Sequence, residues 1–194
     1  MSAKENILNT IAKNQPKLVP LPEIDLNSVI DYEDLYTQFK TVLEGIGGKV
    51  EMISDVSFLK EELKTDKESG NFVVNTIAAL GEVDSHVVSL SASELEKLEK
   101  AYVEGTVGVA ENGAVWIYES QMINRLVPFI CQHLVLVIEK KNLVATLHHA
   151  YKKIEAAREG FGAFIAGPSK TADIEQSLVI GAHGARSARI YVIG

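Results

Sequence analysis

The strongest structural signal in the sequence is the run Leu134-Val135-Leu136-Val137-Ile138, which contains no polar residue. A strand with one face in water alternates apolar and polar side chains, whereas a strand covered on both faces does not. The run therefore predicts a central strand that is buried on both sides. Strands of this kind belong mostly to parallel sheets with helices on both faces.

Strands and helices alternate along most of the chain around this run. Further strands are expected at residues 49–53, 71–77, 162–166 and 188–193, and helices at residues 32–43, 56–64, 93–101, 143–157 and 171–178. The Glu/Lys-rich run at residues 94–100 is interpreted as a solvated helix face. This order predicts an α/β fold, a three-layer α/β/α sandwich with a mostly parallel sheet. Ligands of such folds bind where loops leave the carboxyl ends of the strands.

The first 25 residues are predicted to form a separate unit. Residues 2–14 carry Ile7, Leu8 and Ile11 at helical spacing, and the prolines that follow predict an extended connector up to residue 25. We therefore divide the chain into an N-terminal helical arm with its connector, residues 1–25, and one domain, residues 26–194. The arm is expected to pack on the body or on a partner, which includes a second copy in a homo-oligomer.

The composition is that of a globular protein and argues against nucleic-acid binding. Hydrophobic residues make up 46% of the 194 residues and charged residues 23%, so a packed core is expected. The 19 basic and 26 acidic residues give a net charge of −7. Nucleic-acid binding needs a basic surface for phosphate contacts, and this charge disfavours one.

Several cofactors and locations are also disfavoured by the sequence. The single cysteine, Cys131, excludes an intramolecular disulfide and an iron–sulfur cluster held by about four cysteines. The adjacent His148 and His149 point in different directions on a helix, so no metal site is expected. The sequence has no Gly-x-Gly-x-x-Gly fingerprint after a strand and no P-loop, so no bound cofactor is expected. The polar N-terminus and the lack of about 18 consecutive apolar residues predict a cytoplasmic protein without a membrane segment.

The segment Gly167-Pro168-Ser169-Lys170-Thr171 carries the most functional information. A strand is expected to end before it, the Gly-Pro pair turns the chain, and a helix is expected to follow. Free N–H groups at a helix N-terminus, with Ser169, Lys170 and Thr171 beside them, form an anion-binding site. The alternative is that Ser169 or Thr171 only caps the helix, and Asp173 suits the dipole of its first turn in either case.

A second functional signal follows at Gly181-Ala182-His183-Gly184-Ala185-Arg186-Ser187. Glycines on both sides of a histidine indicate a tight loop with exposed backbone N–H groups. His183 could transfer protons near neutral pH, and Arg186 could bind a carboxylate or phosphate through two parallel hydrogen bonds. The alternative is a glycine-rich turn whose histidine only bonds the backbone.

Together the two segments resemble the signature of a known family. Residues 167–193 are similar to the C-terminal signature of the LUD-domain family, the lactate-utilisation proteins, which reads Gly-Pro-Ser-x-Thr-x-Asp-Ile-Glu and then Gly-x-His-Gly-Pro-Arg before an apolar strand. The matching positions are Gly167, Pro168, Ser169, Thr171, Asp173, Ile174, Glu175, Gly181, His183, Gly184 and Arg186. Ala185 replaces the usual proline. Matches in the middle of the chain, which extend the resemblance to residues 40–194, are Glu111, Gly113, Arg125, Pro128 and His133.

The resemblance implies a role in a complex. The smaller form of the family, component C, is little more than the LUD domain, and it is implicated with two iron–sulfur proteins in oxidising L-lactate to pyruvate. Its fold is similar to that of sugar-phosphate isomerases and CoA transferases. We therefore expect an accessory subunit that binds a small organic or phosphate anion. The expected ligand-binding residues are Ser169, Lys170, Thr171, Asp173, His183 and Arg186.

Two other functions stay open. Glu111-Asn112-Gly113, between apolar segments at residues 106–110 and 114–118, matches the tripeptide that carries the nucleophilic glutamate of CoA transferases. Asn-Gly is equally a preferred hairpin turn. A stand-alone enzyme of the isomerase or CoA-transferase type would use Glu111 or His183 as its catalytic residue. A third interpretation is a binding module that senses an organic acid.

Overall fold

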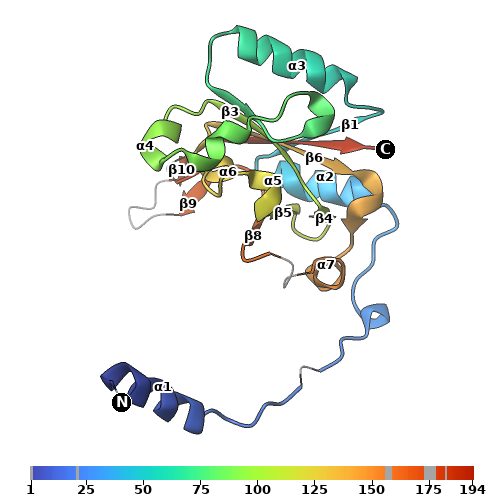
Figure 1. Cartoon of the computed structure of the whole chain (residues 1–194). Helices are drawn as coiled ribbons and strands as arrows, with labels where there is room; N and C mark the ends of the chain where they lie inside the picture. Colours follow the sequence, from blue (N-terminus) through green and yellow to red (C-terminus); the bar gives the residue numbers. More distant parts are fainter. Residues whose placement is uncertain (1, 21, 156–158, 173–177, 182) are drawn as a thin grey trace.

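A five-stranded parallel sheet forms the centre of the body (Figure 1). The computed structural model of the chain describes residues 2–20, 22–155, 159–172, 178–181 and 183–194. The strands, in spatial order, are β1 (Lys49–Ile53), β11 (Ser187–Ile193), β6 (His133–Glu139), β3 (Lys100–Glu104) and β2 (Val73–Asn75). All four pairings between them are parallel. The run at residues 134–138 is the middle strand of this sheet, as predicted.

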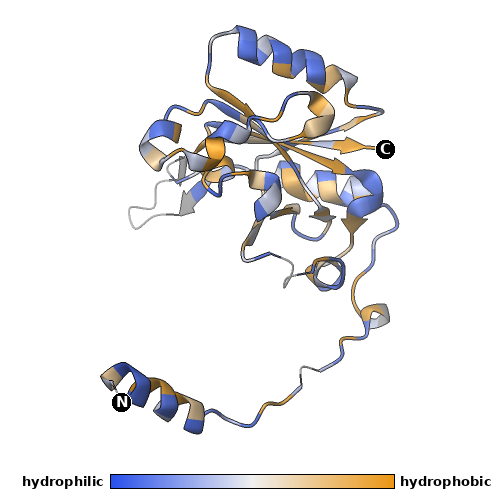
Figure 2. Cartoon of the chain, in the orientation of Figure 1, coloured by the Kyte–Doolittle hydropathy of each residue, from blue (hydrophilic) through white to orange (hydrophobic). Residues whose placement is uncertain are grey.

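Helices cover both faces of the central sheet. Helix α3 (Ser57–Glu68) lies on one face, and α2 (Leu35–Gly45) lies on the other. Alternate residues of β6 contact the two layers, because Leu136 packs in the same cluster as Phe39 of α2 and Val137 packs with Leu59 of α3. Figure 2 shows the hydrophobic residues concentrated along the strands between these layers. Both faces of the middle strand are therefore buried.

The direction of the connections explains which layer covers which face. The connection from β1 to β2 crosses the whole sheet and contains α3, whereas the steps from β2 to β3, β6 and β11 all run back in the opposite direction. Right-handed crossovers that run in opposite directions lie on opposite faces of a sheet. The β3–β6 connection accordingly contributes Val115, Ile117 and Met122 to the cluster on the α2 face.

A second, mixed sheet was not expected from the sequence. Its strands, in order, are β7 (Leu143–Val144), β4 (Val107–Val109), β5 (Ala114–Tyr118) and β8 (Gly162–Ile165). The β4–β5 and β5–β8 pairs are antiparallel, and the β4–β7 pair is parallel. The α/β class and the parallel sheet are thus confirmed, and this second sheet is an addition to the predicted architecture.

Three predicted helices differ from the structure. The helix expected at residues 171–178 is wrong, because β9 (Lys170–Ala172) and β10 (Leu178–Ile180) pair as antiparallel strands. In place of one helix at residues 143–157, β7 precedes a helix, α7, at Leu147–Lys153. In place of one helix at residues 93–101, helix α4 (Ala92–Leu95) ends early and β3 begins at Lys100. Leu95 and Leu98 are fully buried, so the run at residues 94–100 is not a solvated helix face.

Every described residue of the N-terminal arm, at positions 2–20 and 22–25, is exposed. Its helix, α1 (Ala3–Lys13), begins with a capping box in which Ser2 and Glu5 bond each other's backbone N–H groups. Ile7, Leu8 and Ile11 are exposed, and Figure 1 shows the helix at the end of an extended connector. Within the described ranges, no helix is long and apolar enough to cross a membrane.

Candidate functional site

The two segments identified from the sequence lie next to each other. The backbone N–H of Ser169 donates to the carbonyl of Ala185 at 2.8 Å, and the N–H of Gly181 donates to the carbonyl of Ser169 at 3.1 Å. Gly184 approaches so closely that a Cβ there would lie 3.1 Å from the Cβ of Ser169. The segment after β8 and the loop before β11 therefore form one local structure.

These segments line a cavity of about 280 Å³. Its lining combines apolar and aromatic side chains with a hydroxyl, an ammonium and an imidazole group. The lining residues are Pro128, Phe129, Leu134, Phe164, Ile165, Ala166, Gly167, Pro168, Ser169, Lys170, His183, Gly184 and Ala185. We call this space the Ser169 cavity. Its polar groups suit the head of a small anion, and its phenyl rings suit an apolar part of the same ligand.

A glycine in the left-handed conformation turns the chain at the wall of this cavity. Gly167 has a φ of 70°, and a Cβ there would meet Ile46 at 3.2 Å, so only glycine fits without strain. Lys170 lies over the turn that follows α2, where its Nζ is 3.6 Å from the position that a Cβ of Gly47 would take. The turn after α2 thus supports one side of the Ser169 cavity.

The structure does not bring all the predicted residues to this cavity. Ser169, Lys170 and His183 line it, whereas Arg186 is not among its lining residues. The backbone N–H of Arg186 donates to the carbonyl of Gln132 at 2.8 Å. The side chain of Thr171 and all of Asp173 lie outside the described residues. Because Lys170–Ala172 is a strand, the expected helix N-terminus beside Ser169 is wrong.

This cavity does not lie at the carboxyl ends of the central strands. The loop with His183 and Gly184 precedes β11, and Pro128, Phe129 and Leu134 come before or at the start of β6. The cavity thus lies beside the amino ends of two central strands. It follows the carboxyl end of a strand only in the second sheet, at β8.

Glu111 is placed in a hairpin turn between β4 and β5. Gly113 has a φ of 70°, and the side chain of Asn112 accepts a hydrogen bond from the N–H of Ala114 at 3.0 Å. The Glu111 carboxylate accepts a hydrogen bond at 2.7 Å from the N–H of Leu147, the first residue of α7. The carboxylate therefore satisfies a free helix N–H group, as a capping side chain does.

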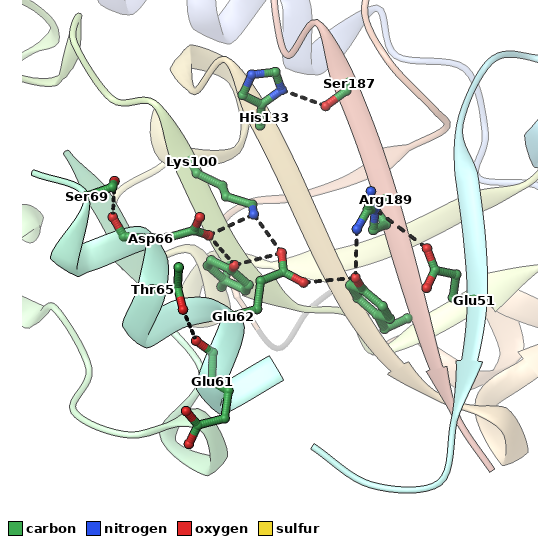
Figure 3. Close-up of polar contacts among 12 residues, drawn as sticks. Glu51, Glu61, Glu62, Thr65, Asp66, Ser69, Lys100, His133, Ser187 and Arg189 are labelled. Atoms are coloured by element: carbon green, nitrogen blue, oxygen red, sulfur yellow. Dashed lines mark hydrogen bonds and ion pairs between the residues drawn. The ribbon is translucent and has the colours of Figure 1, made fainter. Parts of the chain in front are cut away.

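A second cavity, of about 250 Å³, lies at the amino edge of the central sheet beside α3. Its lining residues are Asp66, Asn71, Val73, Glu99, Lys100, His133, Leu134, Val135, Ser187 and Arg189. We call it the Lys100 cavity. The Nζ of Lys100 lies 2.6 Å from Glu62 and 2.7 Å from Asp66, both on α3, as Figure 3 shows. The buried Tyr102 donates to Asp66 at 2.5 Å.

This network changes the acidity of its members. Burial alone would raise the pKa of Glu62, but hydrogen bonding and the positive charge of Lys100 lower it below its ordinary value. Burial and the neighbouring carboxylates raise the pKa of Tyr102. Burial also raises the pKa of Tyr191 to about 12, although Arg189 opposes this change. At neutral pH the network therefore contains an ionised Glu62 and two neutral phenols.

Only a weak signal in the sequence points to the Lys100 cavity. Lys100 and His133 each begin a strand of apolar residues, and such polar side chains mark the edge of a buried sheet. Their partners are 34 to 54 residues away in the chain, so only the strand register brings them together. Because the sequence interpretation treats residues 94–100 as a solvated helix face, Glu99 and Lys100 are not among the predicted site residues.

Comparison with known proteins identifies the body of the chain. A sequence model of the LUD domain matches residues 92–193. Lactate utilization protein C of Shouchella clausii (strain KSM-K16) is 30% identical over 129 residues, which are 64% of this chain and 56% of that protein. The protein of the same name from Geobacillus sp. (strain WCH70) is 32% identical over 122 residues, 57% of this chain and 51% of that one. The chain thus spans about half the length of these curated relatives.

A solved structure supports the fold. The crystal structure of a DUF162 family protein from Deinococcus radiodurans superimposes with a TM-score of 0.63, covering 82% of this chain and 96% of that one. The sequence identity is 17%, so the likeness concerns the fold alone. The matched LUD region contains β3, β6 and β11 and both segments of the Ser169 cavity.

Proposed function

The chain belongs to the LUD domain family, and from this premise we propose that it is an accessory component of lactate utilisation that binds a small organic anion. In this proposal it acts with iron–sulfur proteins that oxidise L-lactate to pyruvate, and it carries no redox cofactor of its own. The family resemblance further suggests the layered fold of sugar-phosphate isomerases and CoA transferases. The names of the curated relatives support the lactate part of the proposal.

The observation that carries the binding part is the shared cavity of Ser169, Lys170 and His183. Lys170 supplies a permanent positive charge, and Ser169 and His183 supply hydrogen-bonding groups. A carboxylate or phosphate held there would gain charge-assisted hydrogen bonds, which are stronger than neutral ones. A volume of about 280 Å³ suits a molecule of the size of lactate or a small phosphate ester.

Thermal unfolding of the full chain tests the binding. The probes are L-lactate, pyruvate, inorganic phosphate, a sugar phosphate and an acyl-CoA. A ligand at one hundred times its dissociation constant stabilises the fold by about 2.7 kcal/mol, a Tm increase of roughly 5 to 11 °C. Lys170→Ala should remove this shift, whereas the exposed Lys97→Ala should keep it. An equal shift in both variants would place the ligand elsewhere.

The variant Arg186→Ala tests whether Arg186 belongs to the anion site. Arg186 does not line the Ser169 cavity, although it lies in the adjacent loop. Loss of the ligand shift in this variant would mean that the guanidinium moves to the anion when the ligand binds. A preserved shift would restrict the site to the three lining residues.

The accessory role is tested by reconstitution. The purified chain is added to the iron–sulfur proteins of a lactate-oxidising system, and lactate-dependent reduction of a dye is measured. The proposal expects little turnover from either fraction and a clear increase with both. Turnover by this chain alone would favour the stand-alone enzyme, and Glu111→Gln would then test the CoA-transferase interpretation.

A further inference from the structure

The Lys100 cavity contains a row of polar side chains that the accessory function does not use. Lys100, His133 and Ser187 are in register across the neighbouring strands β3, β6 and β11. Residues paired in register in a parallel sheet project from the same face. Each residue begins its strand, so the row lies at the amino edge of the sheet, where the cavity opens between the sheet and α3.

Two members of this row form a relay with a carboxylate. The Nδ1 of His133 lies 2.7 Å from the Oγ of Ser187, and its Nε2 lies 3.5 Å from Glu99. In the tautomer that carries its proton on Nε2, facing the carboxylate, the lone pair on Nδ1 faces the serine hydroxyl. Ser187, His133 and Glu99 thus correspond to the nucleophile, the base and the orienting acid of serine hydrolases. The difference is that Nδ1, and not Nε2, faces the serine here.

We propose that Ser187, His133 and Glu99 form a nucleophilic site that hydrolyses small acyl esters or thioesters. All three line the Lys100 cavity, and Ser187 is exposed at its mouth. The volume of about 250 Å³ admits a short acyl chain. This site uses none of the residues of the proposed anion site, so the two proposals can fail independently.

Charge restricts the substrate to neutral acyl groups. Among the described lining residues, the carboxylates of Asp66 and Glu99 balance the positive charges of Lys100 and Arg189, and Glu62, which pairs with Lys100, adds a third carboxylate beside the cavity. Glu62 and Asp66 already bind two of the three N–H groups of Lys100. An anionic acyl group would meet this excess of negative charge.

The reaction balances without a cofactor. The hydroxyl proton of Ser187 passes to Nδ1 of His133 while Oγ bonds to the acyl carbon. The bond from that carbon to the alcohol oxygen or thiol sulfur then breaks, and the leaving group takes the proton from Nδ1. Water next attacks the acyl-serine and gives a proton to Nδ1. Breakage of the acyl–Oγ bond releases the carboxylic acid, and Ser187 recovers its proton.

Active-site labelling tests the proposal on the full chain. A fluorophosphonate probe should add once, and peptide mass spectrometry should locate it on Ser187. The protein should hydrolyse p-nitrophenyl acetate, and Ser187→Ala should lose both labelling and hydrolysis. His133→Ala should lose at least about a hundredfold in rate. Glu99→Gln, which acts through the histidine, should retain labelling at a reduced rate and change the pH profile.

The control is an unrelated serine close to a histidine. Ser89 and His86 are exposed neighbours, and Ser89 donates only to a backbone carbonyl, so Ser89→Ala should keep full labelling and hydrolysis. Labelling at another residue, or hydrolysis that survives Ser187→Ala, would overturn the proposal. So would an unlabelled protein, because the Ser187–His133 contact would then serve only to hold the sheet edge together.

Discussion

Replacing Lys100 by methionine removes the positive charge between Glu62 and Asp66 and keeps most of the side-chain volume. Loss of one partner of a buried ion pair costs about 3 to 5 kcal/mol, because the other charge stays buried. The three side chains keep between 16% and 27% of their surface exposed, so solvent screens part of this cost. We expect a loss of about 2 to 3 kcal/mol at pH 7, a Tm decrease of roughly 4 to 12 °C.

The pH dependence of this loss is specific to the network. The folded pKa of Glu62 lies below its ordinary value of 4.5. Its contribution to stability is therefore fully present above that value and is lost as pH falls through the folded pKa. In Lys100→Met the main cause of the lowering is gone, whereas burial, which raises the pKa, remains. The difference between variant and parent should be largest near pH 7 and shrink towards pH 4.

Chemical denaturation of both proteins at several pH values measures this difference. Lys60→Met on α3, the helix that carries Glu62 and Asp66, is the control, because Lys60 is exposed and its replacement should change stability by less than about 0.5 kcal/mol. A loss in Lys100→Met that equals the control, or one that is constant from pH 4 to pH 7, would refute the role assigned to this lysine.

Three further perturbations have definite expected outcomes. Gly113→Ala should destabilise the fold by about 1 to 3 kcal/mol in urea unfolding, because its φ is 70° and a Cβ would lie 3.0 Å from Leu43; an unchanged midpoint would contradict this. Leu98→Ala should cost about 2 to 5 kcal/mol, whereas Lys97→Ala should cost less than about 0.5 kcal/mol, since only the leucine is buried. Burial raises the pKa of the Cys131 thiol to about 12, so the native protein should not react with a disulfide reagent at pH 8 and the urea-unfolded protein should; rapid native reaction would show that the thiol is accessible.

The parts of the fold that the sequence predicted are those specified by local pattern. The run at residues 134–138 predicted a doubly covered strand because its lack of polar residues allows no exposed face. Helix α3 and strand β1 were likewise predicted from the local pattern of their own residues. The second sheet was not predicted, because three of its four strands are only two to four residues long. Segments this short pair through distant neighbours, and their own sequence contains little information about the sheet they join.

The errors in the site have a similar origin. A Gly-Pro turn followed by Ser and Thr is typical of a helix start, but Lys170–Ala172 pairs with Leu178–Ile180. The β-forming Leu-Val-Ile of that second segment is the available signal, but the helix expected at residues 171–178 includes only its first residue, Leu178. Ser169, Lys170 and His183 still line one cavity, because the loop contacts depend on Gly167 and Gly184, whatever structure follows.

The connectivity of the sheet explains why both candidate sites lie at its amino edge. In doubly wound folds a crevice opens at the carboxyl edge where neighbouring strands send their connections to opposite faces. Here the steps from β2 to β3, β6 and β11 all run in one direction across the sheet. No two of these neighbouring strands therefore send their connections to opposite faces. A cavity of about 360 Å³ does lie at the carboxyl edge. Its charged residues are Glu104, Glu139 and Lys141, and the lysine already pairs with Glu139. An excess of negative charge disfavours a carboxylate ligand there, whereas Lys170 and His183 favour one in the Ser169 cavity.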